Sequence, residues 1–365
     1  MNLVVFNLAM DADHATLGHA TAWTNALARR VDQVSVITML VGRVAVEPNV
    51  TVYSLGKELG RSEPMRLLAY YRLVHRVLTE RRIDACFAHM APLFAALFAP
   101  VAKPRGIPTL LWFAHTSVTP TLRLAHALVD RCVTPTPGSF PLVSSKLAIV
   151  GHGIDTQVFR PPAERPPSYA RTAVSVGRIT PIKRIEEMLK ALKILRRERE
   201  LDLHLDLIGG PATNTDRGYE ARLRRTAVEL GVEELVAFRG PVRYDEVPDR
   251  YHAAGLALSL SGGAMDKAIL EAMASGCVPI STNASFQALA RQHGFDWLVP
   301  EPHAQGLAAC ILEALDRTGA GREAIVGRLR RIVMEEHSLN LLSDRIVAHL
   351  AELAASSRRR SRRAR

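Results

Sequence analysis

The sequence predicts an α/β fold built from two Rossmann-like doubly wound domains in tandem. Short apolar runs alternate with amphipathic segments of helical length through most of the 365 residues, a pattern typical of parallel sheets covered by helices. A proline-rich segment, residues 160–168, interrupts this alternation once, and the pattern then restarts. The length also suits two domains of about 150–180 residues better than one.

The first predicted domain, residues 1–162, contains strands bounded by polar or turn residues and three helices. The expected helices are Ala20–Arg30, Met65–Arg81 and Pro92–Lys103. The expected strands are Leu3–Leu8, Val34–Met39, Thr51–Leu55, Ala85–Ala88, Thr109–Phe113, Cys132–Thr134 and Leu147–Val150. The N-terminus has a very short apolar run and no basic leader, which favours a first strand over a signal peptide.

The second predicted domain, residues 163–337, follows the proline-rich linker. Its first helix, Arg184–Arg199, carries apolar residues at helical spacing. The other expected helices are Tyr219–Leu230, Asp245–Ala253 and Lys267–Ser275, and the expected strands are Ala173–Val176, Leu203–Ile208, Val236–Phe238, Leu256–Leu260 and Val278–Ser281. A last helix near 339–355 follows this domain, and we expect it to pack back on the first one.

Composition restricts the class of protein. Hydrophobic residues make up 48% of the chain, and the four cysteines form no CxxC pair, so we expect two packed cores with free thiols in the cytoplasm. The longest apolar stretch, 83–102, contains Asp84, His89 and two prolines, which argues against a spanning helix.

Six arginines lie among the last eight residues, and subtracting them from the formal net charge of +11 leaves +5. We expect this tail, residues 356–365, to be disordered and solvated. Docking on an anionic membrane surface at the inner face is an open alternative. Nucleic acid is not expected, since no aromatic residues accompany the arginines.

Residues 261–276, SGGAMDKAILEAMASG, are the most informative segment. A strand ends at the glycines Gly262 and Gly263, and a helix begins near Asp266. The free amides of Lys267, Ala268 and Ile269 would form an anion site at the helix start, and Glu271 could accept hydrogen bonds from ribose hydroxyls. The alternative is a capped core helix in which Asp266 is only the N-cap.

A second segment, 177–183 (GRITPIK), follows the strand that ends at Val176 and precedes a helix. Arg178 and Lys183 both project from this loop and could neutralise a diphosphate leaving group. Taken alone, two basic residues in a loop are more often solvated charges.

Together the two segments resemble the retaining family-4 glycosyltransferases of the GT-B fold. The resemblance includes LDLIGG at 205–210, VAFRGPV at 236–242, ILEAMASGCVPIST at 269–282 and VGHGIDTQVFRP at 150–161. It implies two Rossmann-like domains facing across a cleft, with the acceptor on the N-terminal domain and a nucleotide-sugar on the C-terminal one.

By this resemblance Arg178 and Lys183 would bind the donor diphosphate, and Glu271 would bind the ribose. The backbone around Arg239–Val242 would line the base, while the amides of Lys267, Ala268 and Ile269 would hold phosphate and sugar. One departure concerns the first of two glutamates that the family usually has eight positions apart, because Gly263 occupies its place here. Either Asp266 supplies the carboxylate or the sugar is held differently.

In the first domain the resemblance points to Gly18 and His115. Gly18, between the first strand and helix, would allow close approach of the donor phosphates, although related enzymes often have two glycines there. His115 follows a strand end and would contact the donor sugar or the acceptor. Two other patterns are discounted: Asp11-Ala12-Asp13 as a metal site, and His152 with Asp155 as a catalytic dyad.

The function expected is therefore retaining transfer of a hexose-type sugar from a UDP- or GDP-linked donor to a saccharide or lipid-linked hydroxyl, without a metal or other cofactor. Two alternatives stay open: a catalytically silent GT-B subunit that docks at a membrane, and a GT-B nucleotide-sugar epimerase.

Overall fold

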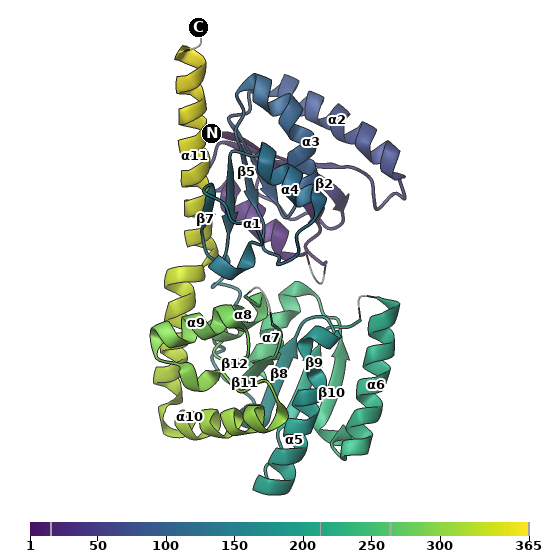
Figure 1. Cartoon of the computed structure of the whole chain (residues 1–365), viewed down its shortest axis with the longest axis vertical. Helices are drawn as coiled ribbons and strands as arrows, with labels where there is room; N and C mark the ends of the chain where they lie inside the picture. Colours follow the sequence, from purple (N-terminus) through teal and green to yellow (C-terminus); the bar gives the residue numbers. More distant parts are fainter. Residues whose placement is uncertain (15–16, 212, 263–264, 364–365) are drawn as a thin grey trace. The chain divides into compact units, whose positions relative to one another are not determined.

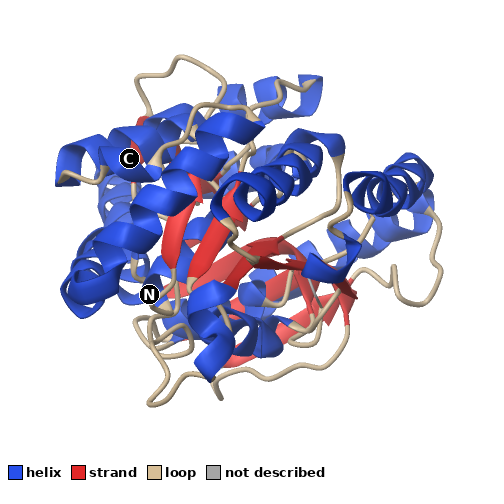
Figure 2. Cartoon of the chain, turned by 90° about the horizontal axis from the view of Figure 1, so that it is seen from below, coloured by secondary structure: helices blue, strands red, loops and turns tan. Residues whose placement is uncertain are grey.

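The computed structural model describes residues 1–14, 17–211, 213–262 and 265–363. The chain divides into two compact units: residues 1–153 with 338–365 form unit 1, and residues 154–337 form unit 2. Each unit is a parallel sheet with helices on both sides (Figures 1 and 2).

Unit 1 has a seven-stranded parallel sheet of order β3-β2-β1-β4-β5-β6-β7. The order reverses between β1 and β4, which are neighbours. Its strands are β1 (Asn2–Met10), β2 (Gln33–Val41), β3 (Val50–Ser54), β4 (Ala85–His89), β5 (Thr109–Trp112), β6 (Arg131–Thr134) and β7 (Leu147–Ile149). Its helices are α1 (His19–Ala28), α2 (Glu63–Glu80), α3 (Pro92–Ala102), α4 (Pro120–Leu128) and α11 (Leu339–Arg363), with a short 3-10 turn η1 (Lys103–Arg105).

Alternate side chains of β1 point to opposite faces of this sheet, and their neighbours show which helices cover each face. Val4 and Phe6 point into a cluster that includes side chains of α2 and α3. Leu3 and Val5 point the other way, into a cluster with α1 and α11. The last helix therefore completes the core of unit 1 although it comes from the far end of the chain (Figure 1).

Unit 2 has a five-stranded parallel sheet of order β10-β9-β8-β11-β12, and its order reverses between β8 and β11. Its strands are β8 (Thr172–Val176), β9 (His204–Ile208), β10 (Val236–Gly240), β11 (Leu256–Ser259) and β12 (Val278–Ser281). Its helices are α5 (Ile185–Arg199), α6 (Asn214–Leu230), α7 (Val247–His252), α8 (Lys267–Ala274), α9 (Ala284–His293) and α10 (Ala304–Ile332). One buried hydrophobic cluster joins them.

The predicted domain boundary at 162 is wrong by several residues, because the units divide between Gly153 and Ile154. The proline-rich segment is fixed to unit 2 instead of linking the units. Arg165 donates hydrogen bonds to the carbonyl oxygens of Ala254, Ser275 and Gly276 at 2.9–3.0 Å, and Phe159 is fully buried.

The expectation of a disordered tail is also wrong for most of its length, since α11 continues to Arg363. Ser357 Oγ donates to the carbonyl of Gly106 at 2.6 Å, and Arg358 pairs with Asp84. These contacts hold the helix against unit 1 beyond residue 355.

The cysteines agree with the prediction of free thiols, since all four are unpaired and buried. Burial raises the pKa of Cys277 to about 11. Within the described ranges, no helix is both long and apolar enough to cross a membrane.

Candidate functional site

The candidate site lies in unit 2, at the carboxyl ends of β8 and β11, where the strand order reverses (Figure 1). Open α/β sheets bind ligands at this kind of position. The loop after β8 carries Arg178 and Lys183, and the loop after β11 leads to Asp266 at the start of α8. Two segments about 80 residues apart in the sequence are therefore brought together by the sheet.

Lys183 and Asp266 form an ion pair across this reversal point. Their side chains are only 14% and 16% exposed. Asp266 Oδ2 also accepts hydrogen bonds from Ser259 Oγ at 2.8 Å and Ser261 Oγ at 3.4 Å. Burial opposes ionisation of this carboxyl, but Lys183 and the hydrogen bonds outweigh it and lower the pKa of Asp266.

Asp266 is at the same time the N-cap of α8. Its Oδ1 accepts the amide of Ala268 at 3.2 Å, and its carbonyl accepts the amide of Ile269 at 3.1 Å. Two of the three amides expected to hold phosphate are therefore already bonded to Asp266. The N-cap that the sequence offered as one interpretation is therefore present, and the same carboxylate also pairs with Lys183.

Glu271 lies one turn into α8 and is 5% exposed, which excludes the surface position that a merely capped helix would give it. Its Oε1 accepts from Lys267 Nζ at 2.9 Å and from Tyr244 Oη at 3.0 Å. Lys267 Nζ also donates to Tyr244 Oη at 2.7 Å. Burial, and next the charge of Glu271, raise the pKa of Tyr244 well above its ordinary value, so the phenol stays a donor to the carboxylate.

Arg178 is exposed, and it lines a small pocket together with Lys183 and the ends of β8 and β9. Its side chain has no hydrogen-bond or ion-pair partner among the described residues. One cation beside the reversal point is thus held by a carboxylate and the other is available.

Three glycines with positive φ shape the same edge: Gly177 (φ 137°), Gly209 (φ 125°) and Gly240 (φ 74°), at the ends of β8, β9 and β10. A Cβ built at Gly209 would lie 2.0 Å from the carbonyl oxygen of Gly177. The close approach of these two backbones requires glycine at 209.

The remaining predicted residues of unit 2 lie further along the sheet. Arg239, at the end of β10, is exposed and pairs with Asp206 of β9 at 3.1 Å. Val242 is partly buried against the core of the unit. Gly263 lies outside the described residues.

In unit 1, His115 is exposed in the loop after β5, and its Nδ1 accepts the amide of Ser117 at 3.0 Å. This bond places the proton of the neutral ring on Nε2. Gly18 is the N-cap of α1 with φ −55°, a conformation that other residues also adopt. Asp13 of the discounted DxD pattern forms two 2.8 Å bonds with Arg43.

The sequence did not indicate the residues whose side chains bond to the predicted site residues. These are Tyr244, Ser259, Ser261 and Asp206. The spacing of Ser259 and Ser261 at a strand end was the one available signal, because alternate residues face the same side.

Part of this chain is similar in sequence to known proteins. Residues 170–317 match the family model of glycosyl transferases group 1. The D-inositol 3-phosphate glycosyltransferase of Thermobispora bispora is 27% identical over 229 residues, which cover 60% of this chain and 51% of that protein. The chain thus spans about half the length of this curated relative.

A second relative is the GDP-mannose-dependent alpha-(1-6)-phosphatidylinositol monomannoside mannosyltransferase of Mycobacterium tuberculosis. It is 28% identical over 297 residues, covering 70% of this chain and 75% of that protein. Among solved structures, HepE of Anabaena in complex with UDP superposes with a TM-score of 0.71 at 16% identity, covering 96% of this chain and all of that one. The fold of the chain is therefore GT-B, and its residues 170–317 are similar to glycosyl transferases group 1.

Proposed function

We propose that the chain is a glycosyltransferase that moves a hexose-type sugar from a UDP- or GDP-linked donor to a hydroxyl of a saccharide or lipid-linked acceptor. The observation that carries the proposal is the Lys183–Asp266 pair at the strand reversal of unit 2, beside Arg178, whose side chain has no partner among the described residues. This reversal lies within the residues that match the group 1 family model. Relatives with a nucleotide-sugar in their printed names, such as the GDP-mannose-dependent mannosyltransferase, support the same class of donor.

Donor binding would exchange one partner of Lys183 for another. The diphosphate would draw the Lys183 ammonium away from Asp266 and take up the Arg178 guanidinium, so that two positive charges face it. Asp266 would keep the hydroxyls of Ser259 and Ser261 and the amide of Ala268. Because these three donors remain, the carboxylate would not be left buried without partners.

Glu271 would bind the ribose of the donor. Lys267 and Tyr244 both use its Oε1, and Oε2 has no partner among the described residues. An oxygen with spare acceptor capacity on this largely buried side chain suits a ribose hydroxyl, and the Lys267–Tyr244 contacts would fix its orientation.

In the transfer step the bond between the anomeric carbon and the donor phosphate oxygen breaks, and a bond from the acceptor oxygen to that carbon forms. The acceptor proton passes to the departing phosphate oxygen on the same face of the sugar, so the configuration is retained. Arg178 and Lys183 would stabilise the charge that develops on the diphosphate, and the proposed transfer uses no metal. His115 Nε2 would donate to a sugar hydroxyl.

The proposal is tested by calorimetric titration with UDP, GDP and ADP in EDTA, comparing the wild type with Lys183→Ala and Glu271→Ala. Binding of one nucleotide in the micromolar range that both substitutions weaken supports the donor site and identifies the base. If the folded wild type binds none of the three, the donor-site proposal is wrong.

A further inference from the structure

A second, separate pocket lies in unit 1, at the edge of the sheet where β4 and β5 begin. The end of α2, the turn before β5 and the last turns of α11 surround it, and its volume is about 460 Å³. Because ligands of doubly wound sheets bind at the carboxyl ends of the strands, this pocket at the amino ends is not part of the site described above.

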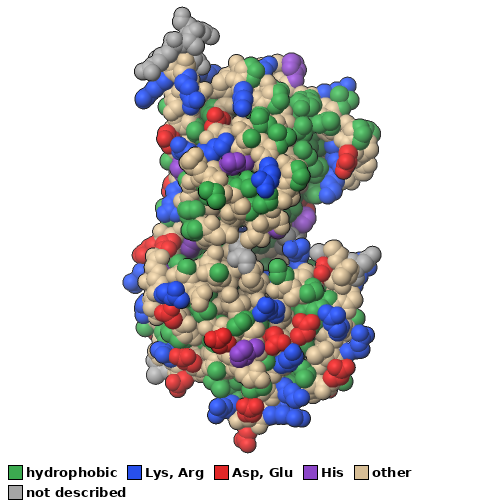
Figure 3. All heavy atoms as spheres, viewed as in Figure 1, with side chains coloured by type: hydrophobic (Ala, Val, Ile, Leu, Met, Phe, Trp, Pro, Cys, Tyr) green, Lys and Arg blue, Asp and Glu red, His purple; other side chains and the backbone are tan. Residues whose placement is uncertain are grey.

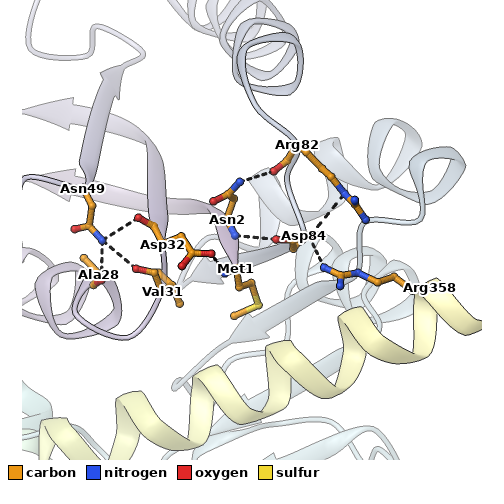
Figure 4. Close-up of polar contacts among 9 residues, drawn as sticks. All are labelled: Met1, Asn2, Ala28, Val31, Asp32, Asn49, Arg82, Asp84 and Arg358. Carbon is orange, nitrogen blue, oxygen red and sulfur yellow. Dashed lines mark hydrogen bonds and ion pairs between the residues drawn. The ribbon is translucent and has the colours of Figure 1, made fainter.

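Four arginines line the pocket: Arg81, Arg82, Arg105 and Arg358. Asp84 is the one acidic residue among its lining residues. Arg358 lies 2.5 Å and Arg82 3.9 Å from the same Asp84 oxygen, while the amide of Asn2 donates to the other oxygen at 2.9 Å (Figure 4). A single carboxylate is thus shared by two of the guanidinium groups.

The other two arginines, Arg81 and Arg105, form no ion pair among the described residues. Arg105 donates to the carbonyl of Val101 at 3.1 Å, and Arg81 donates to the side-chain oxygen of Gln33. The pocket therefore holds an excess of three positive charges. Lys and Arg side chains lie near this end of α11 on the face shown in Figure 3.

The floor of the pocket is apolar. Ile83, Ile107 and Ala354 line it and are at most 7% exposed. An arginine rim over an apolar floor suits a ligand that combines an anionic group with a carbon skeleton. Guanidinium groups bind phosphate through paired N–H donors, and the volume falls in the range of small-molecule sites.

We propose that this pocket binds a phosphate ester, with the phosphate on the arginine rim and the carbon portion over the apolar floor. Two sources share this chemistry: a free phosphorylated metabolite and the phosphate headgroup of a lipid. Binding at this place would also join α11, which closes the core of unit 1, to α2 and to the turn before β5.

The test compares two full-length variants that lose the same charge. Arg81→Gln/Arg105→Gln removes pocket arginines, and Arg359→Gln/Arg360→Gln removes exposed arginines of α11 that do not line the pocket. Both variants and their parent carry Arg178→Ala and Lys183→Ala, so that the proposed donor site does not bind the probe. Inorganic pyrophosphate is titrated by calorimetry, and flotation measures binding to phosphatidylcholine vesicles with and without phosphatidic acid.

We expect the pocket variant to bind its probe at least about tenfold more weakly than the parent, which corresponds to a loss of about 1.4 kcal/mol in binding free energy. The α11 variant should bind the probe as tightly as the parent. If this holds for pyrophosphate, the source is a free phosphate compound; if it holds only for vesicles with phosphatidic acid, the source is a lipid. Absence of binding to both probes, or equal loss in both variants, overturns the proposal. Should the pocket variant fail a thermal-unfolding check, Arg105→Gln alone replaces it.

Discussion

Replacing Lys183 with alanine separates the structural role of the Lys183–Asp266 pair from its role toward a ligand. The substitution leaves Asp266, 16% exposed, without its cation. Removing one partner of a fully buried pair costs about 3–5 kcal/mol. Here Ser259, Ser261 and the Ala268 amide still donate to the carboxylate, so we expect a loss of about 1–3 kcal/mol in the free energy of unfolding.

The effect on nucleotide affinity has a different origin. A charge-assisted hydrogen bond from Lys183 to the diphosphate contributes about 1.5–3 kcal/mol, so its loss weakens binding about tenfold to a hundredfold. The second substitution Asp266→Asn removes the unpaired charge and should restore most of the stability. It supplies no cation, and so the affinity should stay low.

Urea unfolding measures the first quantity and calorimetry with the bound nucleoside diphosphate measures the second, in the wild type, Lys183→Ala and Lys183→Ala/Asp266→Asn. The reasoning is refuted if Lys183→Ala binds nucleotide as tightly as the wild type. It is equally refuted if Asp266→Asn restores stability and affinity together, since the lysine would then act only through the fold.

Three further predictions concern the surroundings of this pair. Tyr244→Phe removes the hydrogen bonds to Glu271 and Lys267. It should lower the free energy of unfolding, measured in urea, by about 0.5–3 kcal/mol, and it should weaken nucleotide binding. Unchanged affinity would show that nucleotide binding does not depend on the orientation of Glu271. Gly209→Ala should lower the free energy of unfolding by about 2–5 kcal/mol, because the new Cβ would meet the Gly177 carbonyl at a positive φ. As the control, Gly231→Ala, where φ is 67° and the space is open, should lower it by only about 1–2 kcal/mol. Equal losses in the two variants would contradict the steric argument. Because the pKa of Asp266 is lowered from 3.8, its contribution to stability is complete above that pH and is lost as the pH falls through the lower value of the folded state. Asp266→Asn should therefore flatten this part of the acid-unfolding curve, and an unchanged curve would exclude the carboxylate as its source.

The strands of both sheets were predictable because buried parallel strands are short continuous apolar runs between turn residues. All twelve expected strands correspond to strands of the structure. Helices α4, α9 and α10 were not predicted. The glycines Gly306, Gly321 and Gly327 lie inside α10, and they weaken the local signal for a helix that is stabilised by packing against α5 and α8.

The site was predictable only in part. Arg178, Lys183, Asp266 and Glu271 stand out because charged residues follow apolar strand ends or interrupt an apolar run. Which of them pair depends on strand order, and the adjacency of β8 and β11 is not readable from local pattern. Tyr244 gave no signal at all, since its contact with Glu271 joins segments 27 residues apart.

The most direct measurement of the central claim is release of nucleoside diphosphate from UDP- and GDP-linked sugars in EDTA, first without and then with candidate saccharide and lipid-linked acceptors. We predict slow release from one donor without acceptor, faster release with the right acceptor, and loss of both in Lys183→Ala/Asp266→Asn despite its restored stability. Donors that remain intact with the folded wild type, although the nucleotide binds, would contradict the assignment as a glycosyltransferase.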